Sequence, residues 1–243
     1  MSQTGSPNLR ILANAQEAAD ACAAHIFAVL AGALAAQPRA TIAISGGSTP
    51  KLLFAALAKG SFDWSKVHFF WVDERCVPPT DSQSNFKLAD EALFTPARVP
   101  AGSIHRVFGE LSPEAAATRY NNDIQSFFSA ANGQLPAFDV LHRGMGSDAH
   151  TASLFPGEPL IQDRTGVAAN VWVEKMHMHR VTLLPGVLLA AKNTVLQVSG
   201  EEKSEALEHV LHGPEDWLQY PCQIASRDER ATWFLDRAAA QKL

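Results

Sequence analysis

Short apolar runs alternate with longer segments of mixed polarity along most of this chain. The runs are four to six residues long and are bounded by turn-forming residues, as is typical of strands buried on both faces. They predict strands over residues 40–45, 67–72, 138–141 and 194–199.

Segments with apolar residues at helical spacing separate these runs. Pro38 and Arg39 end the first helix, and Pro50 opens the second, at a position that proline favours. The pattern predicts helices over residues 11–37, 50–59, 85–93, 113–131, 181–191 and 201–212. Residues 221–227 indicate an edge strand, and a closing helix follows them.

This alternation of helices and strands predicts an α/β fold with a mostly parallel, doubly wound, Rossmann-like sheet. We expect one three-layer α/β/α domain over residues 1–243, because the chain shows no internal repeat, low-complexity tract or linker. In such sheets ligands bind beyond the carboxyl ends of the strands. The motifs described below all begin where a predicted strand ends.

The composition is that of an ordinary globular protein, with 47% hydrophobic and 19% charged residues. Residues 1–10 are polar, and we see no stretch that approaches the roughly 20 apolar residues of a membrane helix. These features predict a cytoplasmic protein that does not bind membranes. Cys22, Cys76 and Cys222 are far apart and form no CxxC pair, which favours reduced thiols over disulfides or a zinc site.

A formal net charge of -5 argues against a broad nucleic-acid interface, which needs clustered lysines and arginines. An anionic ligand must therefore meet a local positive site. The candidates are helix N-termini and four side chains, Arg75, Arg143, Arg180 and Lys203.

Residues 144–156 place His150 among small residues directly after a predicted strand. Glycine and alanine allow the backbone to turn tightly and approach a ligand, and the ordinary pKa of histidine suits proton transfer near neutral pH. The segment is typical of a catalytic loop. The alternative is a glycine-rich turn with an incidental histidine.

The turn over residues 45–50 lies between a predicted strand and a helix. Its free backbone N–H groups and the helix dipole suit a phosphate or a sugar oxygen. The candidate binding residues are Gly46, Gly47, Ser48 and Thr49. The alternative is a tight turn in which Ser48 or Thr49 caps the helix. The turn lacks the lysine of a Walker A loop, so we do not expect it to bind a nucleoside triphosphate.

Asp73, Glu74 and Arg75 follow the second predicted strand. The planar guanidinium of Arg75 suits phosphate. Asp73 either orients Arg75 or holds a substrate hydroxyl, whereas Glu74 fits a solvated or a structural carboxylate equally well. On the residues alone, an internal pair between Asp73 and Arg75 is favoured.

Lys203 follows a predicted strand and falls in the first turn of the next helix, where the helix dipole disfavours a cation. This placement indicates an anion contact. The alternative is a surface lysine paired with Glu201 or Glu202. Arg180 is either a second phosphate contact or part of a substrate loop, and its alternative is simple exposure.

Residues 176–179 carry two histidines, two positions apart, but their spacing fits no strong zinc signature. We interpret this segment as a mobile lid before Arg180. The Gly-Met-Gly run at residues 144–146 lacks the third glycine of a dinucleotide-binding motif. We therefore expect no metal and no cofactor.

Four segments in this order resemble the 6-phosphogluconolactonase family, with residues 144–156 as the most specific part. They are residues 45–50, residues 71–78 with 81–85, residues 144–156, and residues 200–203 preceded by 180–183. The resemblance extends over about residues 40–211, with a weaker tail over 225–239. It implies hydrolysis of a small sugar-phosphate lactone, with Arg75 as a phosphate ligand and supporting contacts from Arg180 and Lys203.

The resemblance also makes His150 the general base, which takes a proton from water and then protonates the departing ring oxygen. Asp148 either influences His150 or forms an Asx turn. The oxyanion donors are N–H groups of this loop or of the Gly46–Gly47 turn, and the sequence does not choose between them.

The chain departs from the family pattern at two places. Ala149 stands where the family usually has glycine, which costs on the order of 1 kcal/mol if the position requires a positive φ. His142 and Arg143 stand where two aliphatic residues are expected, and Arg143 either points at the anion site or is solvated at a strand end.

Two other functions compete with the lactonase. A glucosamine-6-phosphate deaminase or isomerase shares the Gly-Gly turn and a loop histidine, but Arg75 stands here instead of an aromatic residue, and residues 151–156 do not lead to an Asn-Glu-Pro ending. A sugar-phosphate sensor domain would need a separate DNA-binding partner. We expect a monomer or a weak homo-oligomer, and the sequence does not indicate which lactone ring size is preferred.

Overall fold

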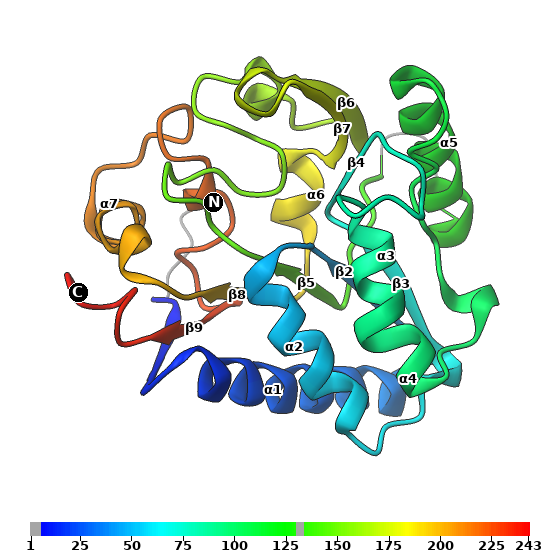
Figure 1. Ribbon diagram of the computed structural model, residues 1–243, viewed down its shortest axis with the longest axis horizontal. Coiled ribbons are helices and arrows are strands. Elements are labelled where there is room, and N and C mark those ends of the chain that lie inside the picture. The colour runs from blue at the N-terminus through cyan, green and yellow to red at the C-terminus, as the bar shows by residue number, and fades with distance from the viewer. Residues whose placement is uncertain (1–5, 130–133) are drawn as a thin grey trace.

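A computed structural model describes residues 6–129 and 134–243, and its centre is a parallel sheet of six strands (Figure 1). The strands lie in the order β1-β9-β8-β5-β2-β3, and every neighbouring pair is parallel. Their bounds are β1 Asn8–Leu12, β2 Ala40–Ile44, β3 Val67–Trp71, β5 Val140–Arg143, β8 Thr194–Val198 and β9 Ala231–Asp236. The prediction of a mostly parallel α/β fold is confirmed.

Helices flank this sheet, and α1 lies beside α2 along its lower side in Figure 1. The α-helices are α1 Ala15–Ala36, α2 Ser48–Lys59, α3 Asn85–Ala89, α4 Thr95–Ala97, α5 Pro113–Phe128, α6 Pro185–Ala190 and α7 Ser204–His212. A π-helical turn, η2 Asp90–Phe94, joins α3 to α4. Short 3-10 turns are η1 Trp64–Lys66, η3 Ala101–Ser103, η4 Pro159–Gln162, η5 Glu174–Met176, η6 Glu201–Lys203 and η7 Pro221–Gln223.

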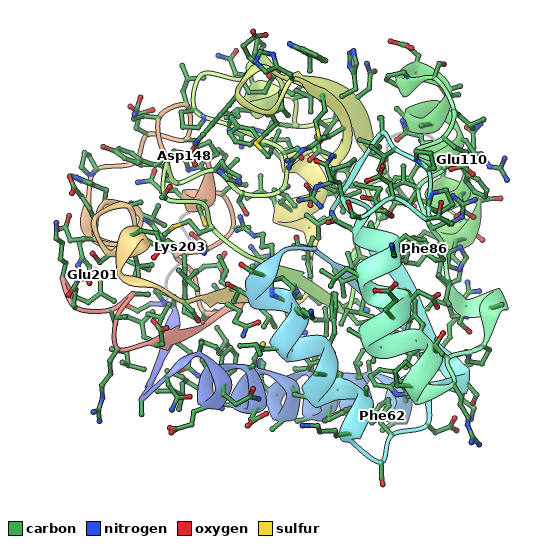
Figure 2. All side chains as sticks on the ribbon, viewed as in Figure 1. Phe62, Phe86, Glu110, Asp148, Glu201 and Lys203 are labelled. Atoms are coloured by element: carbon green, nitrogen blue, oxygen red, sulfur yellow. The ribbon has the colours of Figure 1, made fainter. Side chains whose placement is uncertain are left out.

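All residues of β2 and β8 are buried, as the continuous apolar runs predicted. Side chains fill the space between the sheet and the helices (Figure 2). The first and last strands in chain order, β1 and β9, were not predicted from the sequence.

A second, antiparallel sheet lies over the carboxyl ends of the main strands, in the order β4-β7-β6. Its strands are β4 Asp73–Arg75, β6 Ala168–Val173 and β7 Met178–Leu183. The helix predicted over residues 181–191 is therefore wrong in its first part. The β-branched Val181 and Thr182 continue β7, and the helix begins only at Pro185, which favours the first turn.

Three other expectations need correction. Residues 8–12 form the edge strand β1, and α1 begins only after Asn14, whose side chain caps it. Residues 221–223 are a 3-10 turn, not an edge strand, and the last strand is β9. The closing helix expected after residue 227 is also wrong, because β9 occupies residues 231–236 and only turns follow it. The predicted end of the helix at residue 131 lies outside the described residues.

Helix α1 also contradicts the statement that no segment approaches a membrane span. It is long and apolar enough by length and composition, with a mean hydropathy of 1.7 over its most apolar 18 residues. Many small alanines give this value. The helix buries Cys22, Ile26 and Leu30 and packs on β8 and β9, and core helices pass the same test.

Candidate active site

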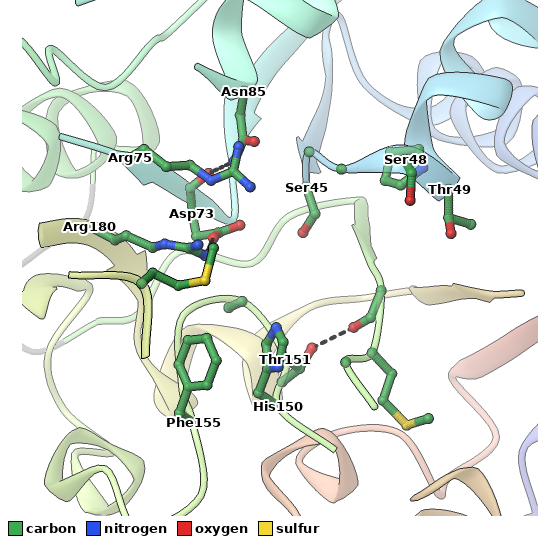
Figure 3. Close-up of a pocket in the computed structure, with 18 of the residues that line it drawn as sticks. Ser45, Ser48, Thr49, Asp73, Arg75, Asn85, His150, Thr151, Phe155 and Arg180 are labelled. Atoms are coloured by element: carbon green, nitrogen blue, oxygen red, sulfur yellow. Dashed lines mark hydrogen bonds and ion pairs between the residues drawn. The ribbon is translucent and has the colours of Figure 1, made fainter. Parts of the chain in front are cut away.

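A cavity of about 290 Å³ lies at the carboxyl ends of the main strands. The segments that follow β2, β3 and β5 line it, together with β7 and the turn after β8. Figure 3 shows His150 and Phe155 on one side and Arg75, Asp73 and Arg180 on another. The structure brings these predicted residues into its wall: Gly46, Gly47, Ser48, Thr49, Asp73, Arg75, His150, Arg180 and Lys203.

Asp148 does not line this cavity but contacts His150, with 2.5 Å between its Oδ1 and the ring Nδ1. Its other oxygen accepts a hydrogen bond from Lys175 at 3.2 Å. The hydrogen bond and the charge of His150 are the main reason that the pKa of Asp148 lies well below its ordinary value. Because an ionised carboxylate accepts only, Nδ1 carries the proton, and the lone pair of a neutral ring is on Nε2.

The His150 ring is fixed on its other side by Phe155, whose ring stacks on it with 4.1 Å between centroids. The backbone is held as well, because the Gly146 N–H donates to the His150 carbonyl at 2.9 Å. The ring of His150 is therefore held in one orientation, which favours the catalytic-loop interpretation, because an incidental histidine does not need to be held.

The loop is strained at two alanines. Ala149 has φ +64° and Ala152 has φ +53°. The condition stated for Ala149 is therefore met: this position lies in the left-handed region, where glycine has no steric penalty and alanine costs on the order of 1 kcal/mol.

Arg143 fits neither expectation, because it is fully buried and lies outside the cavity wall. Its Nη1 donates to the Thr151 hydroxyl at 2.9 Å, and its Nη2 donates to the carbonyl of Ile224. The neighbouring His142 is also fully buried, and neither ring nitrogen has a hydrogen-bond partner in the described part of the chain. Burial lowers the pKa of His142 to about 4, an effect that the nearby Gln197 amide partly offsets.

Asp73 is paired with Arg180 and not with Arg75. Its Oδ2 lies 3.6 Å from the Arg180 guanidinium and accepts a hydrogen bond from Ser153 at 2.8 Å. Arg180 is only 5% exposed, which excludes a simple surface role. The antiparallel pairing of β4 with β7 places Arg75 opposite Arg180, so two guanidinium groups reach one cavity.

Arg75 donates to the Gln83 carbonyl. Within residues 6–129 and 134–243, no carboxylate lies within ion-pair distance of it. Glu74 is structural: it is buried and accepts from the Ser84 hydroxyl and from three backbone N–H groups at the start of α3 and at Arg75. Burial raises its pKa, which these hydrogen bonds oppose.

The turn before α2 matches the anion-site interpretation better than the capping alternative. Gly47, with φ +122°, is the cap residue, and within residues 6–129 and 134–243 the helix has no side-chain cap hydrogen bond. Gly46 cannot be replaced easily, because a Cβ there would lie 1.9 Å from Oδ1 of Asn85. The N-terminal N–H groups of α2 thus stay available at the cavity.

Lys203 lines the cavity in the short turn η6, directly before α7 (Figure 2). In the described part of the chain it has no ion pair with Glu201 or Glu202, contrary to the surface alternative. Burial lowers its pKa, which Glu202 and Asp236 partly counteract.

Several other residues of the wall had no predicted role, among them Asn85, Phe155, Lys175 and Gln197, whereas Met176 belongs to the segment expected to form a lid. Asn85 and Phe155 stand inside quoted motifs, which was the available signal. Lys175 and Met176 belong to the turn between β6 and β7. Whether this turn moves as a lid stays a prediction. Among the described residues no group of three His, Cys, Asp or Glu side chains is placed to hold a metal ion.

Comparison with known proteins gives consistent matches over nearly the whole chain. The family model "Glucosamine-6-phosphate isomerases/6-phosphogluconolactonase" matches residues 13–233. A 6-phosphogluconolactonase of Nostoc sp. is 39% identical over 221 residues, covering 90% of each chain. One of Synechocystis sp. is 33% identical and covers 98% of this chain and 99% of its own length.

Solved structures agree with these sequence matches. The 6-phosphogluconolactonase of Thermotoga maritima superposes with a TM-score of 0.82 at 26% identity, covering 94% of this chain and 99% of that one. A monomeric glucosamine-6-phosphate deaminase has a TM-score of 0.81 at 17% identity, with 97% and 100% covered. At that identity the second likeness shows a shared fold only.

Proposed function

The chain belongs to the glucosamine-6-phosphate isomerase/6-phosphogluconolactonase family, and we propose that it hydrolyses 6-phospho-D-glucono-1,5-lactone to 6-phospho-D-gluconate in the oxidative pentose phosphate pathway. The observation that carries the proposal is one cavity whose wall holds His150, Arg75, Arg180 and Lys203, with Asp148 in contact with the His150 ring from outside the wall. A hydrolytic base and several cations for a phosphate group thus share one wall.

In the proposed reaction, Nε2 of His150 takes a proton from water, and the water oxygen attacks the lactone carbonyl carbon. A tetrahedral intermediate with a negative oxygen forms. As the bond from this carbon to the ring oxygen breaks, the imidazolium returns the proton to the ring oxygen. Asp148 holds Nδ1–H and stabilises the imidazolium through its negative charge.

The three cations have different surroundings, which supports different tasks. Arg75 has no carboxylate partner in the described chain and is free to bind the phosphate bidentately. Arg180 is neutralised in part by Asp73, so it supplies a fixed donor with less net charge. Lys203 is half-buried and without an ion pair in the described part of the chain, and it adds a third contact.

The oxyanion donors stay open between two backbone sources. One is the loop over residues 144–152, and the other is the Gly46–Gly47 turn at the start of α2. Both contribute residues to the wall of the same cavity, where fixed donors are worth more than in water.

We also propose that the protein acts in the cytoplasm, as a monomer or weak homo-oligomer. The close relatives from Nostoc and Synechocystis support the first part. Size-exclusion chromatography with light scattering tests the second, and a stable tetramer would contradict it.

The decisive experiment generates the lactone in place from glucose 6-phosphate and follows its product with excess 6-phosphogluconate dehydrogenase. We expect the chain to accelerate formation of the second NADPH over spontaneous hydrolysis. His150→Ala should reduce kcat by about 10²- to 10⁴-fold, the usual contribution of general acid–base catalysis. His212→Ala, at an exposed position of α7, is the matched control.

Circular dichroism and thermal melting check that His150→Ala stays folded. If the wild-type chain gives no acceleration, the lactonase proposal is wrong, and release of ammonia from glucosamine 6-phosphate is measured next. If the variant keeps full turnover, His150 is not the base.

A further inference from the structure

Arg143, at the end of β5, is a buried charge without an opposite charge beside it. It is 0% exposed. No carboxylate within residues 6–129 and 134–243 lies within ion-pair distance of its guanidinium, and its Nε has no hydrogen-bond partner there. A guanidinium stays protonated at neutral pH even though burial lowers its pKa. Since burying an unpaired charge is costly, this residue calls for an explanation other than fold stability.

The two hydrogen bonds of Arg143 join segments that are far apart in the sequence. Nη1 donates to the hydroxyl of Thr151, the residue directly after His150. That hydroxyl in turn donates to the Gly144 carbonyl at 2.9 Å. Nη2 donates to the carbonyl of Ile224 in the segment before β9. One planar group therefore spans the His150 loop and the 221–226 segment.

A backbone contact runs parallel to this link, because the Cys222 N–H donates to the Ala149 carbonyl at 2.9 Å. Both segments are strained where they meet. Ala149, Ala152 and Ala225 all have φ between +50° and +64°. Each such alanine costs on the order of 1 kcal/mol, and conformations of this kind persist only where the surroundings hold them.

We propose that Arg143 is a positioning residue for the hydrolysis proposed above: through Thr151 and Ile224 it clamps the strained loop in the one conformation that aims His150 into the cavity. The inference rests on the proposed function for its catalytic readout, but the clamp itself is a property of the loop. Misplacing a catalytic group by about 1 Å costs roughly 10²-fold in rate. The clamp therefore acts on kcat and leaves the phosphate contacts unchanged.

A double-mutant cycle tests the inference. Arg143→Met keeps the apolar stem and removes both donors, whereas Thr151→Val keeps the shape and removes the hydroxyl. We expect each to lower kcat by about tenfold or more, with KM changed by less than about threefold. Because both changes break one link, the double variant should lose about as much as Arg143→Met alone.

Conservative variants separate positioning from packing. Thr151→Ser keeps the hydroxyl and should recover most of the kcat lost in Thr151→Val. Arg143→Lys keeps the charge but offers a point donor in place of a fork, so it should recover only part of the loss. Independent, multiplicative losses in the cycle, or a change in KM alone, would overturn the proposal.

Hydrogen exchange tests the clamp without any activity assay. In Arg143→Met, amides of residues 144–154 and 221–226 should exchange about tenfold faster, while those of α1 stay unchanged. Thr151→Val provides the same test if the arginine variant does not fold. If the wild-type chain lacks lactonase activity but Arg143→Met still exchanges faster than wild type, the clamp stands and the proposed function is wrong. If the variant and the wild type exchange equally fast, the clamp is wrong.

Discussion

The methyl group of Ala149 strains the backbone of the His150 loop. Ala149 has φ +64°, so we expect Ala149→Gly to keep or raise the free energy of unfolding, by up to about 1 kcal/mol, since relief of strain outweighs the added freedom of the unfolded chain. The matched control is Ala31→Gly at an exposed interior position of α1, which should lose about 1 kcal/mol. Urea unfolding measures both, and equal losses would contradict the strain.

Burial of His142 predicts a pH-dependent stability. Its pKa is about 4 in the folded chain and near the ordinary 6.5 when unfolded, so the unfolded chain binds the extra proton between these values. Stability from this residue is therefore lost as the pH falls from 6.5 to 4, by about 3 kcal/mol in total. His142→Leu should flatten this part of the profile. Urea unfolding of both proteins at pH 7, 5.5 and 4 checks it, and parallel profiles would refute it.

At the scale of elements, the pairing of β4 with β7 gives two arginines with unequal tasks. Arg75 has no carboxylate partner in the described chain, so Arg75→Gln should raise KM about tenfold, the value of a charge-assisted contact, with little loss of stability. Arg180 neutralises the buried Asp73, so Arg180→Gln should also lower the free energy of unfolding, by about 3 kcal/mol. Steady-state kinetics and urea unfolding of both variants separate the effects. Equal stability of the two variants would show that the Asp73 pair is not structural.

The burial of each element explains which elements can be predicted from the sequence. Strands β2, β3, β5 and β8 are almost fully buried, so their sequences are mostly apolar and readable, although β5 ends in His142 and Arg143. Strand β7 is not readable in this way, because its apolar end runs directly into α6 and only the partner strands distinguish the two. The edge strand β1 is mostly exposed, so its apolar residues do not mark a buried run, and Ile11 and Leu12 were included in the helix expected over residues 11–37.

At the scale of the whole molecule, the parallel sheet is what makes the cavity predictable. Motifs that follow four separate strands meet because the carboxyl ends of parallel strands share one edge. Contacts between individual side chains could not be predicted from the sequence in this way. The link from Arg143 to Ile224 spans 81 positions, and no local pattern distinguishes a buried guanidinium from one solvated at a strand end. Similarly, the sequence favoured Arg75 as the partner of Asp73, and only the second sheet shows that the partner is Arg180.

The charge distribution of the whole chain predicts a salt effect on binding. The net charge is -5, yet among the described residues the cavity wall holds Arg75, Lys175, Arg180 and Lys203 against one carboxylate, that of Asp73. A phosphate-bearing lactone is therefore attracted locally by a protein that repels it overall. Raising the ionic strength shortens the screening length from about 30 Å at 0.01 M to about 10 Å at 0.1 M, which weakens the attraction between partly exposed charges.

We therefore expect KM to rise with added sodium chloride, by about two- to fivefold between 0.01 and 0.2 M, while kcat changes little because the chemistry is at the His150 end of the cavity. Initial rates over a range of lactone concentrations at each salt concentration measure this. Arg75→Gln is the control, because removing one cavity cation should reduce the slope of log KM against log salt. A KM that falls with salt would mean that the net negative charge, and not the local cations, governs the approach of the substrate.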